Sequence, residues 1–209
     1  MNTNPWLRVA LEDYEGHMAR PEVGQAALLA TAFRNAVESV RPESLALVGC
    51  AGGNGLEALV GTDIAPVVCV DINPSYLETL SARYRRKIRG LEIVCGEVER
   101  FSFRQPLDLI FGGLIFEYTR LDEALAALSR ALRRGGKLIA LVQMRSDGTP
   151  TVSHSPYVQA LAGVGAALNY IEPDAMAVAA ARQGLEERAR KVITLASGKA
   201  FTIVEFERT

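Results

Sequence analysis

The sequence has little of what several common kinds of site require. It contains only three cysteines and two histidines, and Cys50, Cys69 and Cys95 lack the close pairing of a metal-binding motif. We therefore expect reduced thiols, no bound metal and a cytoplasmic location. No apolar run approaches the roughly 18 residues that a membrane span needs, and the first residues lack the basic and apolar regions of a signal peptide.

The charge of the chain gives no sign of a polyanionic partner. The 209 residues carry a formal net charge of −1, with 49% hydrophobic and 22% charged side chains. This balance is typical of a globular protein long enough for one domain with a full core. The basic run Arg83–Arg89 lies at the end of a predicted helix and is poor in aromatic residues, so we expect it to face water and not to bind nucleic acid.

Residues 45–73 are the most informative stretch of the chain. Two short apolar runs, Leu45–Val48 and Val67–Val70, have the composition of buried strands, and a glycine-dense turn follows the first while Asp71 follows the second. Glycine lets a ligand approach the main chain closely, and a carboxylate at the tip of the next strand can accept the hydroxyls of a ribose. The stretch therefore predicts a nucleoside site. A phosphate-binding P-loop is excluded because no Gly-Lys-Ser/Thr follows the glycines.

The spacing of the glycines separates two kinds of cofactor. The dinucleotide pattern G-x-G-x-x-G should begin directly after the first strand, but its best match, Gly53–Ala58, begins too late. Counting from Gly49 gives Gly49-x-Ala51-x-Gly53, which resembles the G-x-G-x-G loop of class I S-adenosylmethionine-dependent methyltransferases. The chain is similar to a type 11-like bacterial member of this family from about Leu45 to Phe206.

The order of the remaining elements agrees with that resemblance. Helical spacing of apolar residues predicts helices at about 21–40, 74–86 and 122–133, the last capped by Gly135-Gly136, and further apolar runs predict strands at 91–95, 107–111 and 138–142. Near the end of the chain, 191–195 and 200–206 form a predicted hairpin that turns at Ser197-Gly198.

Strands that alternate with helices pair in parallel through right-handed crossovers. We therefore expect an α/β fold, with a single-domain, doubly wound, mostly parallel seven-stranded sheet and an antiparallel C-terminal strand, as in class I methyltransferases. Residues 1–40 are a predicted N-terminal lid or helical segment. Residues 41–209 are the predicted S-adenosylmethionine-binding domain, and together they form one compact unit.

The resemblance implies which residues contact the cofactor. The glycine loop would line its methionine part, the acid after the second strand would bind the ribose, and the next two segments would hold the adenine. In chain order these residues are Gly49, Cys50, Ala51, Gly53, Asp71, Ile72, Glu97 and Val98.

Candidate catalytic residues lie in three segments. Glu117 and Tyr118 follow the fourth strand, where they would face the transferred methyl group or simply begin the next helix. Tyr14 and His17 lie in the N-terminal segment, which is either a lid over the cofactor or an arm anchored by Trp6. His154 lies in the long insert from about 143 to 173, which would shape an acceptor pocket or a dimer contact.

The acceptor decides whether a base is needed. A hydroxyl would require one, such as His17, His154 or Glu117, whereas an amine, thiol or carboxylate would need only orientation and desolvation. The segment that begins at Gly112 lacks the Asn-Pro-Pro-Tyr type of sequence, which argues against adenine methylation of DNA. We expect a small-molecule acceptor, with S-adenosylhomocysteine as the product of the cofactor. The oligomeric state is open, a dimer included.

Two positions depart from the family pattern. Leu47 stands where an acid is usual, and Ala51 replaces the second glycine of the loop. These departures leave open a catalytically inactive module that binds the cofactor and regulates a partner. A nicotinamide-dependent oxidoreductase that uses Gly53–Ala58 and Asp71 is a further alternative.

Overall fold

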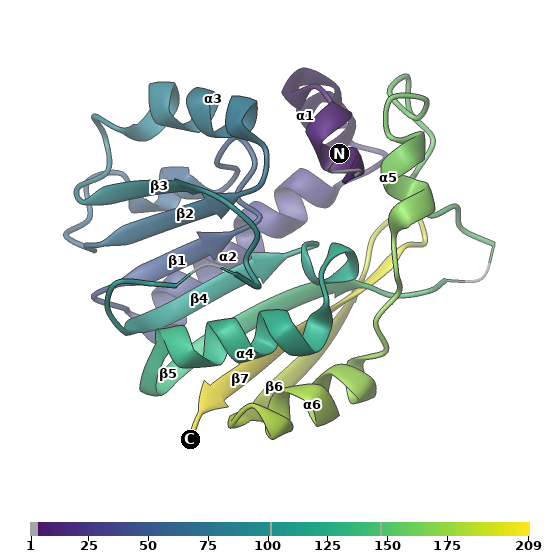
Figure 1. Ribbon diagram of the computed structural model, residues 1–209. Helices are drawn as coiled ribbons and strands as arrows, with labels where there is room; N and C mark the ends of the chain where they lie inside the picture. The colour runs from purple at the N-terminus through teal and green to yellow at the C-terminus, as the bar shows by residue number, and fades with distance from the viewer. Residues whose placement is uncertain (1–3, 101, 147) are drawn as a thin grey trace.

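The protein is built around a seven-stranded sheet with the strand order β3-β2-β1-β4-β5-β7-β6 (Figure 1). The computed structural model describes residues 4–100, 102–146 and 148–209, so residues 1–3 of the predicted N-terminal segment lie outside the described residues. Strands β1 to β5 pair in parallel, and β7 runs antiparallel to both β5 and β6. The predicted fold and its closing hairpin are confirmed. The strands are β1 Leu45–Val48, β2 Val67–Asp71, β3 Leu91–Cys95, β4 Leu107–Gly113, β5 Leu132–Gln143, β6 Leu185–Thr194 and β7 Ala200–Arg208.

Helices cover both faces of the sheet because the inner strands are apolar on both sides. Leu45 and Leu47 of β1 pack in the same cluster as helices α2 and α3, whereas Ala46 and Val48 pack in the opposite cluster with α4 and α6 (Figure 1). Strands buried on both faces are expected in a parallel sheet. The helices are α1 Leu11–Met18, α2 Gln25–Val40, α3 Pro74–Tyr84, α4 Leu121–Ala131, α5 Ala162–Ala167 and α6 Pro173–Arg182, with short 3-10 turns η1 Pro5–Arg8, η2 Leu56–Leu59 and η3 Phe116–Tyr118.

Local capping chemistry sets where the helices begin. Helix α3 starts at Pro74 because the side chain of Asn73 accepts a hydrogen bond from the main-chain N–H of Ser75 at 3.0 Å. Helix α2 begins at Gln25 and not near Pro21 as predicted, because Gly24 takes a left-handed conformation with φ of +68° and separates the helix from the preceding turn.

The expectation that Gly135-Gly136 caps helix α4 is wrong. The helix ends at Ala131, and β5 begins at the next residue because Leu132 already pairs with Leu107 of β4. The register then shifts between Leu107 and Leu109, which leaves the glycine pair in a bulge inside a long strand. A side chain at Gly136 would lie 2.9 Å from the carbonyl oxygen of Leu107, so glycine allows the close approach of the two strands.

The N-terminal segment and the β5–α6 insert lie over the same end of the sheet (Figure 1). Val9 packs with Leu161 and Val164 of the insert in a small apolar cluster, with Trp6 and Tyr14 at its margin. This cluster packs together two segments that are far apart in the sequence, and both segments cover the carboxyl edge of the sheet.

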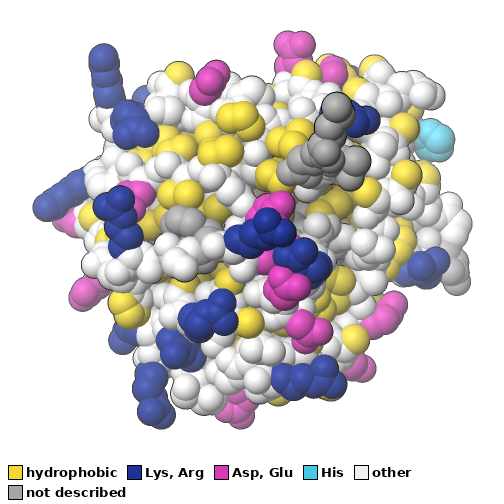
Figure 2. Space-filling model, in the orientation of Figure 1, with side chains coloured by type: hydrophobic (Ala, Val, Ile, Leu, Met, Phe, Trp, Pro, Cys, Tyr) yellow, Lys and Arg dark blue, Asp and Glu magenta, His cyan; other side chains and the backbone are white. Residues whose placement is uncertain are grey.

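On the face of the molecule seen in Figure 2, Lys and Arg side chains are interspersed with Asp and Glu, so this face carries charge of both signs. Within the residues that the structure describes, no helix combines the length and the apolar character needed to cross a membrane. Among the same residues, no group of three or more His, Cys, Asp or Glu side chains could hold a metal ion.

Candidate active site

A cavity of about 550 Å³ opens at the carboxyl edge of the sheet. Because β1 to β4 are parallel, the turns that follow them meet at this edge, and each of them contributes to the lining. The volume lies in the range of roughly 300–1,000 Å³ that small-molecule and cofactor sites occupy. We call this space the main cavity. Its lining includes Trp6, Tyr14, Gly49, Ala51, Asp71, Ile72, Tyr76, Gly96, Glu97, Val98, Gly113, Leu114, Tyr118 and Asn169.

The glycine loop after β1 is shaped for close approach of the main chain. Gly49 has φ of +67°, and a Cβ added there would lie 2.9 Å from the Cβ of Ile115. Ala51 also adopts a left-handed conformation, with φ of +44°. This strained alanine is held by a hydrogen bond of 2.8 Å from its main-chain N–H to Oδ2 of Asp71. The second motif glycine can therefore be an alanine without loss of the turn.

Asp71 joins the loop to the start of helix α3. Its Oδ1 accepts the main-chain N–H of Asn73 at 2.9 Å, while Oδ2 accepts that of Ala51. Burial raises the pKa of Asp71, and the hydrogen bonds from Asn73 and Ala51 oppose that change. Each carboxylate oxygen keeps a second lone pair, so this carboxylate can accept the two hydroxyls of a ribose in the main cavity.

The turn after β3 supplies the far end of the main cavity. Gly96, Glu97 and Val98 all line it, and a Cβ added at Gly96 would meet no atom within 4 Å. Val98 is buried, whereas the Glu97 carboxylate pairs with Arg100 at 3.0 Å on the rim. The turn therefore brings a buried apolar side chain and a carboxylate to the main cavity.

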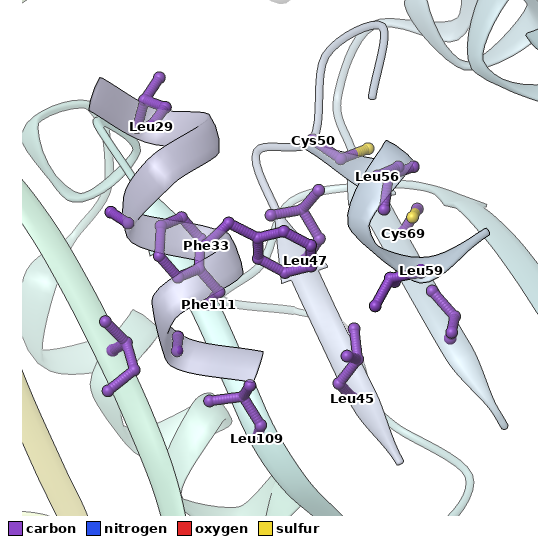
Figure 3. Packing of buried hydrophobic residues seen from close by; sticks show 14 of the residues in the cluster. Leu29, Phe33, Leu45, Leu47, Cys50, Leu56, Leu59, Cys69, Leu109 and Phe111 are labelled. Carbon is purple, nitrogen blue, oxygen red and sulfur yellow. The ribbon is translucent and has the colours of Figure 1, made fainter. Parts of the chain in front are cut away.

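Two of the predicted cofactor residues do not line the main cavity. The Cys50 side chain is buried in the core with Leu56 and Cys69 (Figure 3). At Gly53 a Cβ would lie 2.8 Å from the ring of Tyr84, so this glycine, with φ of +91°, leaves room for a packed aromatic ring. The remaining predicted residues, Gly49, Ala51, Asp71, Ile72, Glu97 and Val98, are brought together.

The N-terminal segment closes one side of the main cavity. The Trp6 ring meets the rings of Tyr14 and Tyr118 edge-on, with centroids 5.4 and 5.2 Å apart. The carbonyl oxygen of Trp6 accepts the Asn73 side-chain amide at 2.8 Å, which ties the segment to the turn that also carries Asp71. The Tyr76 hydroxyl donates to the carbonyl oxygen of Val9 at 2.9 Å.

Helix α1 is fastened to the glycine loop by a basic residue. Arg83 of α3 binds both carboxylate oxygens of Glu15 and also donates to the carbonyl oxygen of Gly52 at 3.0 Å. The expectation that this arginine only faces water is therefore wrong. Its partner lies in a helix more than sixty residues away in the sequence, so the pattern of the basic run could not reveal it.

Comparisons with known proteins agree with this geometry. A family model described as "Methyltransferase domain" matches residues 46–140, which run from β1 to β5 and include the glycine loop, Asp71 and Glu97. Over this stretch, a little under half of its length, the chain is similar to the methyltransferase family. A search of curated proteins found no match.

Solved structures of several methyltransferases share the fold at low sequence identity. N-methyltransferase NodS from Bradyrhizobium japonicum WM9, in complex with S-adenosyl-L-homocysteine, is 15% identical with a TM-score of 0.68, covering 95% of this chain and 97% of that one. Magnesium protoporphyrin IX methyltransferase from Synechocystis PCC 6803 is 9% identical with a TM-score of 0.71, covering 95% and 94%. Geranyl diphosphate C-methyltransferase from Streptomyces coelicolor A3(2) is 12% identical with a TM-score of 0.68, covering 93% and 88%.

The predicted catalytic residues fall into three groups. Tyr14 and Tyr118 line the main cavity, and burial raises the pKa of both phenols, so they stay protonated near neutral pH. His17 and Glu117 line a second, smaller cavity, which shares Trp6, Tyr14 and Tyr118 with the main one. His154 is exposed and lines neither cavity.

Several residues that line the two cavities are not among the predicted site residues. Tyr76, Leu114 and Asn169 line the main cavity, and Gln143 and Lys199 line the second one. Leu114 follows the glycine pair at the end of β4 with φ of +57°, and the adjacent glycines were the only local signal for its turn. The side chains of Gln143 and Lys199 both donate to the carbonyl oxygen of Thr151. The two residues come close together because β5 pairs with β7, which a local sequence pattern does not reveal.

Proposed function

We propose that this protein transfers the methyl group of S-adenosylmethionine to a small-molecule acceptor, releasing S-adenosylhomocysteine. The observation that carries the proposal is the main cavity, in which the left-handed loop at Gly49 and Ala51 meets the carboxylate of Asp71. The methionine part of the cofactor would lie against this loop, and Asp71 would accept the ribose hydroxyls. Ile72, Glu97 and Val98 would hold the adenine.

The bound cofactor supplies a methyl group that its sulfonium already makes electrophilic. The task of the protein is therefore alignment of the acceptor atom with the carbon–sulfur bond, which is mainly a proximity effect. Residues 1–40 act in this proposal as a lid, because Trp6 and Tyr14 close the main cavity and Arg83 fixes the helix that carries Tyr14. Residues 41–209 form the domain that binds the cofactor.

A small-molecule acceptor is supported by the volume of the main cavity, about 550 Å³, and by the mixed surface charge (Figure 2). Two of the similar structures bear the names of small-molecule methyltransferases, for geranyl diphosphate and for magnesium protoporphyrin IX. The unpaired cysteines are consistent with the cytoplasm, which we propose as the location. Leu47 is buried in the core, so recognition of the cofactor's amino group comes from other residues of this chain.

Calorimetric titration tests the proposal directly. We expect S-adenosylmethionine and S-adenosylhomocysteine to bind, and the variant Asp71→Ala to bind both at least about tenfold more weakly, because a hydrogen-bonded charge is lost. Asp63→Ala is the matched control, since that carboxylate is fully exposed and pairs only loosely with Arg89 at 3.6 Å. Unchanged affinity in Asp71→Ala would remove the ribose assignment, and preferential binding of a nicotinamide dinucleotide would replace the methyltransferase proposal by an oxidoreductase.

The same protein separates an enzyme from an inactive regulatory module. Binding of S-adenosylmethionine without methyl transfer to any member of a broad acceptor panel would favour the module, which Leu47 and Ala51 first suggested. Release of S-adenosylhomocysteine that depends on an added acceptor would exclude the module.

A further inference from the structure

The second cavity adjoins the main one. Its volume is about 60 Å³, and Trp6, Tyr14, Leu114 and Tyr118 line both spaces. It therefore admits only a few heavy atoms, the size of one end of a small molecule, since a single water takes about 30 Å³ of liquid. When one end of a ligand lies in the second cavity, the rest of the ligand must lie beside the residues that line both cavities.

Glu117 lines this cavity, and one of its two carboxylate oxygens has no hydrogen-bond partner among the described residues. Glu117 is only 1% exposed, and its Oε1 accepts the main-chain N–H of Gln143 at 2.6 Å. Its Oε2 has no hydrogen-bond partner among the residues that the structure describes. A buried carboxylate oxygen without a donor is costly, so the site is incomplete without a hydrogen-bond donor from a ligand.

Three other polar side chains of the cavity, Lys199, Gln143 and His17, have hydrogen-bond partners. Lys199 Nζ donates to the carbonyl oxygen of Thr151 at 2.6 Å, and the Gln143 side-chain amide donates to the same oxygen at 3.2 Å. His17 Nδ1 lies 2.7 Å from Ser155 Oγ. Glu117 Oε2 is therefore the buried side-chain atom of this cavity that lacks a hydrogen-bond donor among the described residues. Much of the remaining lining is apolar, from Met18, Leu114, Val152, Leu161, Val164 and Leu168.

We propose that the second cavity binds the reacting end of the acceptor, that this end is a hydroxyl group on a small, otherwise apolar molecule, and that Glu117 is the base that removes its proton. This inference rests on the proposed methyl transfer from S-adenosylmethionine. The hydroxyl supplies the donor that Glu117 Oε2 lacks. A cationic ammonium group fits less well because Lys199 places a positive charge in the same cavity.

The reaction balances with these groups alone. The O–H bond breaks, and its proton passes to Oε2 of Glu117. The acceptor oxygen forms a bond to the methyl carbon, and the carbon–sulfur bond breaks with its electron pair remaining on sulfur. The sulfonium becomes a neutral thioether, the carboxylate becomes a carboxylic acid, and the proton later leaves to solvent. Burial raises the pKa of Glu117 to about 7, which suits a base that works near neutrality.

Phenol, aniline and toluene form a matched set of probes, because they share one ring and differ only in the hydroxyl, amino or methyl group. With the protein saturated with S-adenosylhomocysteine, we expect phenol to bind at least tenfold more tightly than toluene. Val164→Phe, which fills the cavity, should abolish phenol binding, whereas Val178→Phe on an exposed face of α6 should not. Equal binding of phenol and toluene, no binding of phenol, or phenol binding that survives Val164→Phe would overturn the proposal.

The catalytic arm measures S-adenosylhomocysteine released from S-adenosylmethionine and phenol. Glu117→Gln keeps the acceptor for the Gln143 N–H and should lower the rate at least about 100-fold, with cofactor affinity within twofold of wild type. Glu186→Gln, an exposed change on β6, should match wild type. Release from aniline but not phenol, bound phenol that is not methylated, or an unimpaired Glu117→Gln would overturn the inference. In each of those outcomes intact cofactor binding leaves the methyltransferase proposal standing, whereas its loss would point to failure of the proposed function itself.

Discussion

Glu117 should make the folded protein less stable as the pH rises through neutrality. The carboxyl group is buried with one oxygen unpaired, and its pKa is raised from the ordinary 4.5 to about 7 chiefly because burial disfavours the charged form. Between these two values the folded state holds a proton that the unfolded chain has released. Stability contributed by this group is therefore greatest at acid pH and falls as the pH rises toward 7.

The magnitude follows from the size of the shift. One pKa unit corresponds to about 1.4 kcal/mol, so going from roughly pH 5 to pH 8 should remove about 2–3 kcal/mol of unfolding free energy through this group alone. Glu117→Gln cannot titrate but keeps the bond from the Gln143 main chain. The variant should therefore gain about 2–3 kcal/mol relative to wild type over that pH range, whatever its fixed offset.

Urea unfolding of both proteins at several pH values measures this difference. Other titrating groups are shared by the two proteins, so their contributions cancel in the comparison. Glu186→Gln is the control, and its difference from wild type should stay nearly constant because that side chain is exposed. A difference between wild type and Glu117→Gln that is flat within about 1 kcal/mol, or that favours wild type as the pH rises, would refute the assignment of a buried, destabilised carboxylate.

Two further substitutions test how the loop and the lid are held. Gly49→Ala should abolish detectable cofactor binding, because its Cβ would meet Ile115 at 2.9 Å, whereas Gly61→Ala, also at positive φ but with nothing within 4 Å, should cost roughly 1 kcal/mol of stability and leave affinity unchanged. Arg83→Met should release helix α1 by breaking the contact with Glu15, a half-exposed ion pair worth roughly 0.5–1 kcal/mol, and should speed cofactor dissociation several-fold in stopped-flow measurements. Loss of affinity in Gly61→Ala, or an unchanged dissociation rate in Arg83→Met, would contradict these expectations.

The sheet and the position of Asp71 at its carboxyl edge were predictable because their causes are local. Apolar runs of strand length, each followed by glycine or acid, place β1 and β2 in the sequence, and parallel pairing then brings Gly49 and Asp71 to one edge. The turn at Ser197-Gly198 predicts the hairpin for the same reason, since Gly198 takes φ of +83° there. In each case the residue type reports a backbone requirement directly.

The errors arose where a residue's role depends on distant parts of the chain. Counting from Gly49 identifies the loop but not the direction of each side chain: the Cys50 side chain packs in the core, and a Cβ at Gly53 would meet Tyr84. Gly135 looked like a helix cap because its bulge exists only through pairing with β4. Burial of a charged residue is likewise a property of the assembled fold, and the residues around Glu117 in the sequence do not indicate that its side chain is buried.

The stability and the proposed chemistry of Glu117 are two consequences of one arrangement. Because Oε2 of the buried carboxylate has no hydrogen-bond donor among the described residues, the charged form destabilises the fold near neutral pH. The same missing donor gives this oxygen affinity for the proton of a ligand. The two effects should therefore appear together in Glu117→Gln: a gain in stability at high pH and a loss of methyl transfer to a hydroxyl. A variant that is both more stable and fully active would show that the buried charge is a defect of packing. A variant that loses activity without the pH-dependent gain would place the base at another residue and make Glu117 a support for the Gln143 main chain.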